Sequence, residues 1–309
     1  MASRTGLVYD ERYLLHNPGE WHPERPDRLK AIVRRLYHMD LMEEVVRIEA
    51  QAAPLAWIEK LHDATYVKRF KEACAKGQRI FMVPDCGICR ESYDIALLAA
   101  GGVMAAVEAV MNGTVHNAFC LVRPPGHHAE RHRAMGFCFF NNVAVGAAHA
   151  IEQHGLERVA VADFDVHHGN GTEDVFRGNP RVLMVSTFQH PFYPYSGTEG
   201  RSERMVNIPL PAYSDGSAFR EAVQTWWLPA LEGFRPQMLF VSAGFDAHRE
   251  DDMASLSLVE ADYAWVTERL KDVAERDCDG RIVSVLEGGY ALSALGRSVA
   301  AHIRVLAGL

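Results

Sequence analysis

Short valine-rich apolar segments alternate with longer segments of helical periodicity along most of the chain. An alternation of strands and helices predicts a parallel sheet with helices on both faces. Strands that are buried on both faces are continuous apolar runs, as these segments are. We therefore expect an α/β fold in which residues 1–309 form a single domain around a central parallel β-sheet. The expected strands are Gly6–Tyr9, Asn117–Val122, Val159–Asp163, Val182–Thr187, Gln237–Ser242 and Ile282–Leu286, and the expected helices are Arg28–Tyr37, Thr65–Lys76, Ser92–Met111, Asn142–His154, Ser217–Leu228, Val259–Ala274 and Leu292–Leu306.

A run of acids and histidines, Asp163–Gly171 (DFDVHHGNG), follows one of these strands. If the backbone stays extended, side chains two residues apart share a face, so Asp163, Asp165 and His167 point one way. Asp246 follows a second expected strand and brings another carboxylate to the same edge of the sheet. Two carboxylates and one imidazole can hold a divalent metal and leave a position open for water. Acid-rich turns are common after strands, so this interpretation needs support from neighbouring motifs.

Two other expected strands end in residues suited to acid–base and oxyanion chemistry. Arg123–His128 (RPPGHH) presents two adjacent histidines on a proline-rich turn, and such a pair can transfer protons. In Glu287–Tyr290 (EGGY), glycines let the backbone approach a ligand closely and aim a tyrosine at it. A phenol in that place can donate to a developing oxyanion. Together the strand ends predict a metal-dependent hydrolase.

Several ordered motifs span the chain: His22–Leu29 (HPERPDRL), Leu61–Tyr66 (LHDATY), Arg123–His128, Gly136–Asn142 (GFCFFNN), Asp163–Gly171, Ser242–Asp246 (SAGFD) and Glu287–Tyr290. Their order resembles that of the zinc-dependent histone deacetylase superfamily, which has an arginase-like fold. The resemblance extends from about Val8 to about Leu306. Asn170 stands where class I members have aspartate, so the chain is most similar to class II and bacterial-type deacetylases.

The resemblance implies two metal ions of different kinds. One zinc ion per chain would be bound by Asp165, His167 and Asp246. A potassium ion nearby would be held by Asp163, Asp165, His167, Ser186 and Thr187, through backbone carbonyls at the first three positions. Backbone ligands leave no sequence signature of their own, so the potassium site is implied by the resemblance alone.

The resemblance also implies the catalytic residues. His128 would be the general base that later protonates the leaving amine, and His127 its electrostatic companion. Asp163 would accept a hydrogen bond from His127, and Asn170 one from His128; a neutral amide raises the pKa of the base less than a carboxylate would. Zinc and Tyr290 would polarise the amide carbonyl.

Five residues are expected to bind the substrate: Asp85, Gly136, Phe137, Tyr193 and Met253. Phe137 and Tyr193 align with the two aromatic walls of an acyl-lysine tunnel, and Gly136 adjoins Phe137 in the same motif. Asp85 matches a loop acid that grips the substrate backbone at the tunnel mouth. The alternative interpretation is core packing for the aromatic residues and a solvated loop for Asp85.

The substrate is less constrained than the reaction, because acyl-lysine and acetylated polyamines are cleaved by the same chemistry. Polyamine-selective relatives have a glutamate seven residues after the third metal ligand, whereas this chain has Met253, which favours acyl-lysine. The acids of Arg249–Asp252 (REDD) either attract a polyamine or form a solvated charge run. His248 and Gly169 replace acids of the arginase pattern, which argues against a two-manganese ureohydrolase. A third hypothesis, a silent acyl-lysine-binding protein, is disfavoured because every catalytic residue is present.

Composition excludes several other classes. The net charge is −8 and long basic tracts are missing, so we expect no direct nucleic-acid binding. Runs of some eighteen apolar residues do not occur, so we expect no membrane association and a cytoplasmic location. Cys86 and Cys89 form a C-x-x-C in an expected loop without the context of a redox motif. The expected partners are acylated lysine in proteins or peptides, or a small acylated amine, and the oligomeric state stays open.

Overall fold

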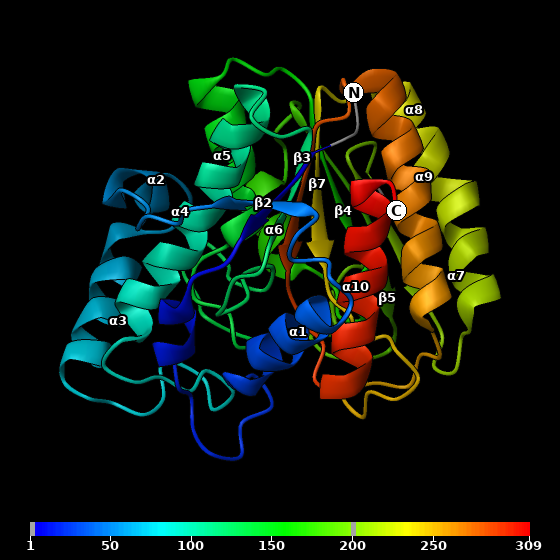
Figure 1. The fold of residues 1–309 in the computed structure, drawn as a ribbon. Helices are drawn as coiled ribbons and strands as arrows, with labels where there is room; N and C mark the ends of the chain where they lie inside the picture. The colour runs from blue at the N-terminus through cyan, green and yellow to red at the C-terminus, as the bar shows by residue number, and fades with distance from the viewer. Residues whose placement is uncertain (1–3, 199–201) are drawn as a thin grey trace.

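A parallel sheet forms the centre of the computed structural model, which describes residues 4–198 and 202–309 (Figure 1). Its eight strands have the order β2-β1-β3-β8-β7-β4-β5-β6, and each pair of neighbours is parallel. The fold class predicted from the sequence is therefore confirmed. The strands are β1 Thr5–Val8, β2 Val45–Ile48, β3 Asn117–Cys120, β4 Val159–Asp163, β5 Val182–Gln189, β6 Met205–Leu210, β7 Met238–Ala243 and β8 Ile282–Leu286.

Helices cover both faces of the sheet (Figure 1). On one face α4 packs against β1, β3 and β8, and α5 packs against β4 and β7. On the other face α10 contacts β1 and β3, α9 contacts β7, and α8 contacts β5. The helices are η1 Glu11–Leu15, α1 Asp27–His38, α2 Leu55–Leu61, α3 Ala64–Ala75, α4 Ser92–Met111, α5 Asn142–Gln153, α6 Asn170–Phe176, α7 Gly216–Ala222, the π-helical η2 Val223–Trp227, α8 Leu228–Phe234, α9 Glu260–Asp277 and α10 Leu292–Ala307.

All six expected strands and all seven expected helices are present, although some ends shift by a few residues. The helix expected over Ser217–Leu228 is longer, because η2 and α8 continue it to Phe234. Pro229 lies just after the π-helical η2, and a proline inside a helix removes one of its hydrogen bonds, so the regular α-helical pattern is interrupted here. Edge strands β2 and β6 were not predicted, because Arg47 and Pro209 interrupt their apolar pattern and both strands are partly exposed.

Helix α4 is long and apolar enough by length and composition to cross a membrane. In the structure most of its side chains are buried between the sheet and α5. Packing inside the protein therefore accounts for its hydrophobic composition, since a helix that is apolar all round is typical of a protein core.

The four strands that precede the motifs of acids, histidines and tyrosine lie side by side in the sheet. β3, β8, β7 and β4 are consecutive neighbours, and their carboxyl ends lead to His127, Glu287, Asp246 and Asp165. Because parallel strands end at the same edge of a sheet, segments far apart in the chain meet there. The fold thus brings the motif loops together at the middle of this edge.

Candidate active site

Three ligand atoms converge at the ends of β4 and β7. His167 Nδ1 lies 3.0 Å from Asp165 Oδ1 and 3.2 Å from Asp246 Oδ2, and all three side chains are buried. Gly288 N donates to Asp165 Oδ2 and Val166 N to Asp246 Oδ1. Apart from this 3.2 Å contact with His167, Asp246 Oδ2 has no hydrogen-bond partner in the described part of the chain. The set of one imidazole and two carboxylates that the resemblance implies is therefore assembled around one point.

The backbone reaches this arrangement by turning instead of staying extended. Strand β4 ends at Asp163 as expected, and the backbone does not meet the condition of staying extended through His167. Asp163 Oδ1 accepts the amide of Asp165, and Asp165 Oδ1 accepts the amide of His167. An aspartate that accepts an amide two residues on stabilises a turn at the expense of a strand. These turns separate Asp163 from the ligand pair and direct its Oδ2 to His127.

Burial makes the pair of carboxylates costly without a cation. Burial, with the charge of Asp165 added, raises the pKa of Asp246 to about 6. Burial also opposes ionisation of Asp165, but His127 and His167 outweigh it, and the pKa of Asp165 lies below its ordinary value. Buried charges need a partner or a metal. Three buried nitrogen and oxygen donors that converge on one place therefore fit a divalent cation.

The adjacent histidines have different partners. His127 Nδ1 lies 3.1 Å from Asp163 Oδ2, and His128 Nδ1 lies 2.7 Å from Asn170 Oδ1. Asn170 Nδ2 donates to Glu130 Oε1 at 2.7 Å, which fixes the amide with its oxygen toward His128. His128 Nδ1 is therefore the protonated nitrogen, and Nε2 is left free as an acceptor.

The charges around the two imidazoles push their pKa values apart. For His127 burial favours the neutral form, but Asp165 and Asp163 outweigh it and raise the pKa to about 10. For His128 burial lowers the pKa well below its usual range, and the neighbouring His127 and His167 add to this shift. The first histidine is thus a cation at neutral pH and the second a neutral base, which is a division of roles suited to proton transfer.

A buried glutamate stabilises the turn that carries the two adjacent histidines. Glu287 Oε2 accepts the amides of Gly126 at 2.7 Å and His127 at 3.1 Å. Burial raises the pKa of Glu287 to about 7, although His127 and the Gly126 amide oppose the rise. The EGGY motif therefore holds the RPPGHH turn as well as carrying Tyr290.

Two side chains hold the turn that carries Tyr290. Asp251 Oδ2 accepts the amides of Tyr290 at 2.6 Å and Ala291 at 2.9 Å. Arg28 donates to the carbonyls of Glu287 and Gly289, and its guanidinium lies 4.9 Å from the centre of the Tyr290 ring. Burial raises the pKa of the Tyr290 phenol well above 10, so the phenol stays protonated and can donate.

The acids of Arg249–Asp252 are neither a free attractive patch nor wholly a solvated run. Asp251 is buried against the Tyr290 turn, and Glu250 pairs with Arg297 at 2.6 Å. Of the three acids, Asp252 alone is exposed and takes no part in these contacts. The interpretation of the whole run as solvated was therefore wrong for Asp251, because the amides at the start of α10 need an acceptor.

A cavity of about 270 Å³ leads to the candidate metal centre. His128, His167 and Tyr290 line it. Phe192, which no motif indicated, lines it too. The cavity is also lined by all five residues expected to bind substrate: Asp85, Gly136, Phe137, Tyr193 and Met253. Phe137 and Tyr193 thus border a cavity instead of lying in the core. A Cβ at Gly136 would collide with the His128 ring, so glycine is required there.

Asp85 is not a solvated loop acid. Its Oδ2 accepts the amide of Gly136 and the hydroxyl of Tyr193, each at 3.1 Å. The carboxylate therefore joins two walls of the cavity. Its other oxygen, Oδ1, is buried.

Other residues singled out from the sequence have structural surroundings. Ser186 is buried on β5 beside Asp163, in register with it, and Thr187 follows on the same strand. His248 accepts the amide of Glu250 through Nδ1, and its Nε2 lies 3.5 Å from Glu260. All six cysteines are free, and burial raises the pKa of the Cys86 thiol, which makes Cys86 a poor nucleophile.

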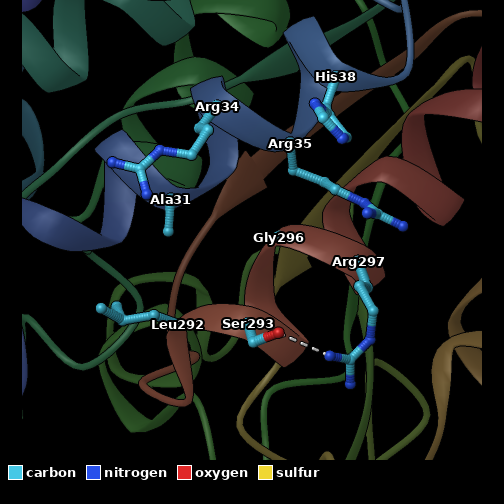
Figure 2. A pocket seen from close by; sticks show the side chains of 8 residues that line it. All are labelled: Ala31, Arg34, Arg35, His38, Leu292, Ser293, Gly296 and Arg297. Atoms are coloured by element: carbon cyan, nitrogen blue, oxygen red, sulfur yellow. Dashed lines mark hydrogen bonds between the residues drawn. The ribbon is translucent and has the colours of Figure 1, made fainter.

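A second hollow, of about 420 Å³, lies between α1 and α10 and contains none of the residues expected to act in catalysis (Figure 2). Arg34, Arg35, His38 and Arg297 line it, but Figure 2 shows Arg34 pointing away from Arg35 and Arg297. Arg297 is engaged by Glu250, Glu260 and Ser293. The cationic groups do not converge on one centre, and this hollow is not a candidate active site.

Comparison with known proteins agrees with the site. A family model described as histone deacetylase domain matches residues 22–306. The chain is 39% identical over 296 residues to a probable deacetylase of Archaeoglobus fulgidus, covering 93% of this chain and 82% of that one. It is 39% identical over 321 residues to a histone deacetylase-like amidohydrolase of Pseudomonas aeruginosa (94% and 83% covered). It is also 36% identical over 331 residues to the polyamine deacetylase HDAC10 of Homo sapiens (98% and 48% covered).

The fold agrees equally well. The crystal structure of the HDA15 HD domain superposes with a TM-score of 0.92 at 34% identity, covering 99% of this chain and 90% of that one. The α/β architecture and the site define a hydrolase of the deacetylase and amidohydrolase class. The chain belongs to the histone deacetylase family.

Proposed function

We propose that this protein is a zinc-dependent deacylase that hydrolyses the amide of acyl-lysine side chains. One observation carries the proposal: the cavity that His128 and Tyr290 line also reaches His167, whose ligand atom converges with those of Asp165 and Asp246. A cation, a base and an oxyanion donor would then act on the same carbonyl group. This is the set of groups that amide hydrolysis requires.

Asp165, His167 and Asp246 would hold one zinc ion per chain. A bound divalent cation acts as a Lewis acid toward the carbonyl and lowers the pKa of water. Nitrogen and carboxylate donors in a set of three suit zinc with an open position. We include a potassium ion near Asp163, Ser186 and Thr187 as part of the proposal; the buried, unpaired Oγ of Ser186 is compatible with it.

The protein side chains would move the protons. His128 Nε2 accepts a proton from the attacking water as the water oxygen bonds to the carbonyl carbon, and His127 stays protonated beside Asp163. The Tyr290 phenol donates a hydrogen bond to the carbonyl oxygen as it becomes negative. When the C–N bond breaks, His128 returns the proton to the leaving amine, and the acyl group leaves as a carboxylate.

The cavity favours acyl-lysine over a polyamine. Met253 lines it where a carboxylate would attract a second positive charge, and two of the three acids of the adjoining loop are engaged by the Tyr290 turn and by Arg297. Deacetylation of polyamines is the alternative, and the similarity to the polyamine deacetylase supports it. A silent acyl-lysine-binding protein is a third hypothesis, from another class.

Steady-state hydrolysis of an acetyl-lysine peptide and of acetylspermidine by the zinc-loaded protein separates these functions. We expect a preference for the peptide, and a loss of about 10²–10³ in rate for Tyr290→Phe, as for a typical oxyanion donor. A preference for acetylspermidine would support the alternative. Binding of the peptide without turnover, in the presence of one zinc per chain, would favour the silent binding protein.

A further inference from the structure

Two histidines and a glutamate meet on the surface, outside the catalytic cavity. Glu108 Oε1 lies 2.6 Å from His149 Nε2 and 2.8 Å from His154 Nε2. One ligand atom from each residue lies within 4.8 Å of the others. His149 is buried, His154 is half-buried and Glu108 is exposed, so solvent reaches the cluster from one side.

The ends of two helices make this place favourable for a cation. Glu108 lies in the last turn of α4, His149 precedes the end of α5, and His154 is the C-cap of α5. The carbonyl end of a helix carries partial negative charge. Burial opposes ionisation of Glu108, but hydrogen bonds from His149 and His154 outweigh it and keep its pKa below the ordinary value. The side chain is thus a carboxylate at neutral pH.

We propose that Glu108, His149 and His154 form a second metal site, for a divalent ion of the zinc, nickel or copper type. Imidazole and carboxylate donors suit these ions, and both Nε2 atoms already point at the carboxylate. The ion would replace the shared hydrogen bonds and link α4 to α5. His149 Nδ1 has no hydrogen-bond partner in the described part of the chain, so the site lacks an outer contact that usually increases affinity.

The site is remote from the reaction. β3 starts at Asn117, just after α4, and runs toward His127, so α4 ends at the edge of the sheet opposite the catalytic cavity. α5 likewise ends before β4 starts at Val159. A metal ion here would stabilise the fold, since it binds the native arrangement only, without entering the cavity. It would also add a second equivalent of metal to that of the catalytic site.

Trp57 provides a local probe, because its ring centre lies 4.7 Å from that of His149. We would take protein that holds one equivalent of zinc per chain, with excess zinc removed, and titrate it with Ni²⁺ by calorimetry and tryptophan fluorescence. The expected result is one further equivalent with a dissociation constant on the order of 1–100 µM, together with quenching of the emission. Trp57→Phe should keep the calorimetric signal and lose most of the quenching.

Metal binding by single variants tests whether Glu108 and His154 hold the ion. His154→Ala and Glu108→Gln change exposed or half-exposed side chains and should weaken binding at least about tenfold. His38→Ala, an exposed histidine on α1, should leave binding unchanged. Nickel should raise the unfolding temperature of the wild type and of His38→Ala, but not of His154→Ala. The proposal is overturned if no further equivalent binds below about 1 mM, or if His154→Ala and Glu108→Gln bind as tightly as the wild type.

Discussion

The carboxylate of Asp251 accepts the backbone amide of Tyr290 at 2.6 Å. The same oxygen accepts the amide of Ala291, and the other oxygen accepts that of Met253. One buried side chain thus fixes both the turn that carries the phenol and a residue of the cavity wall. Asp251 does not line the cavity, so we regard it as a positioning residue for Tyr290.

Asp251→Asn should lower kcat/KM about 10- to 100-fold with little change in KM. Hydrogen bonds to a charged group contribute about 1.5–3 kcal/mol, and the amide loses part of this. Steady-state kinetics on an acetyl-lysine peptide measures the effect. Asp252→Asn, the exposed neighbour, is the matched control and should remain near the wild type. In a Tyr290→Phe background the Asp251 change should add little; a full additive loss would contradict positioning through Tyr290.

Asn170→Asp should move the acid limb of the kcat/KM profile to higher pH by about one unit. A carboxylate 2.7 Å from His128 Nδ1 favours the imidazolium more than the amide does, so the base is protonated, and activity is lost, at a higher pH. Activity at acid pH should fall, while the plateau at higher pH is kept.

Glu130 complicates this exchange, because its carboxylate accepts the Asn170 amide and would face a new negative charge. The double variant Asn170→Asp with Glu130→Gln removes the repulsion and is the better comparison. An unchanged acid limb in the double variant would mean that His128 is not the base whose protonation limits the rate.

Local sequence patterns were sufficient to predict which residues directly after the strands come together at the site. His127, His128, Asp165 and His167 each lie within one short motif, and the strand order then brings the motifs together. The turn through Asp163–His167 was not predicted, because it depends on side-chain acceptance of nearby amides, which competes with an extended strand.

Contacts between distant segments could not be predicted where the family resemblance did not imply them. Asp251 looked like part of a surface charge run, since its partners at the start of α10 are 39 and 40 residues away in sequence. Asp85 accepts hydrogen bonds from Gly136 and Tyr193, and the three residues belong to three separate loops. Phe192 lines the cavity, but it lies in no motif that indicates this. Such residues are recognised only when the packing of the loops is known.

Stabilisation by zinc should grow as pH rises from about 5 to 8. In the metal-free protein burial raises the pKa of Asp246 from 3.8 to about 6. At His167 burial favours a lower pKa, but the carboxylates of Asp165 and Asp246 outweigh it and raise the pKa from 6.5 to about 9. The native state then holds more protons than the unfolded state between each pair of values, and its stability falls as pH rises. Zinc requires the deprotonated ligands and binds more tightly over the same range.

The measurement is the difference in unfolding temperature between zinc-loaded and chelator-treated protein across this pH range. Taking a difference removes the contribution of titrating groups elsewhere. Asp246→Asn abolishes one ligand charge and should flatten the dependence. A difference that stays constant or shrinks toward pH 8 would argue that these three residues do not hold the metal.

Met253→Glu should raise the ratio of kcat/KM for acetylspermidine to that for an acetyl-lysine peptide roughly tenfold. Met253 lines the cavity, and a carboxylate there would attract the additional ammonium groups of a polyamine with about 1–2 kcal/mol at an effective dielectric constant near 20. The acyl-lysine of a peptide has no such charge along the chain.

Met253→Gln is the matched control, because it has nearly the same length and polarity without the charge. If the glutamine variant shifted the ratio as much, the charge at this position would not be the cause, and shape would decide the selectivity. High salt should reduce the gain of the glutamate variant, since screening weakens attraction at a partly exposed site.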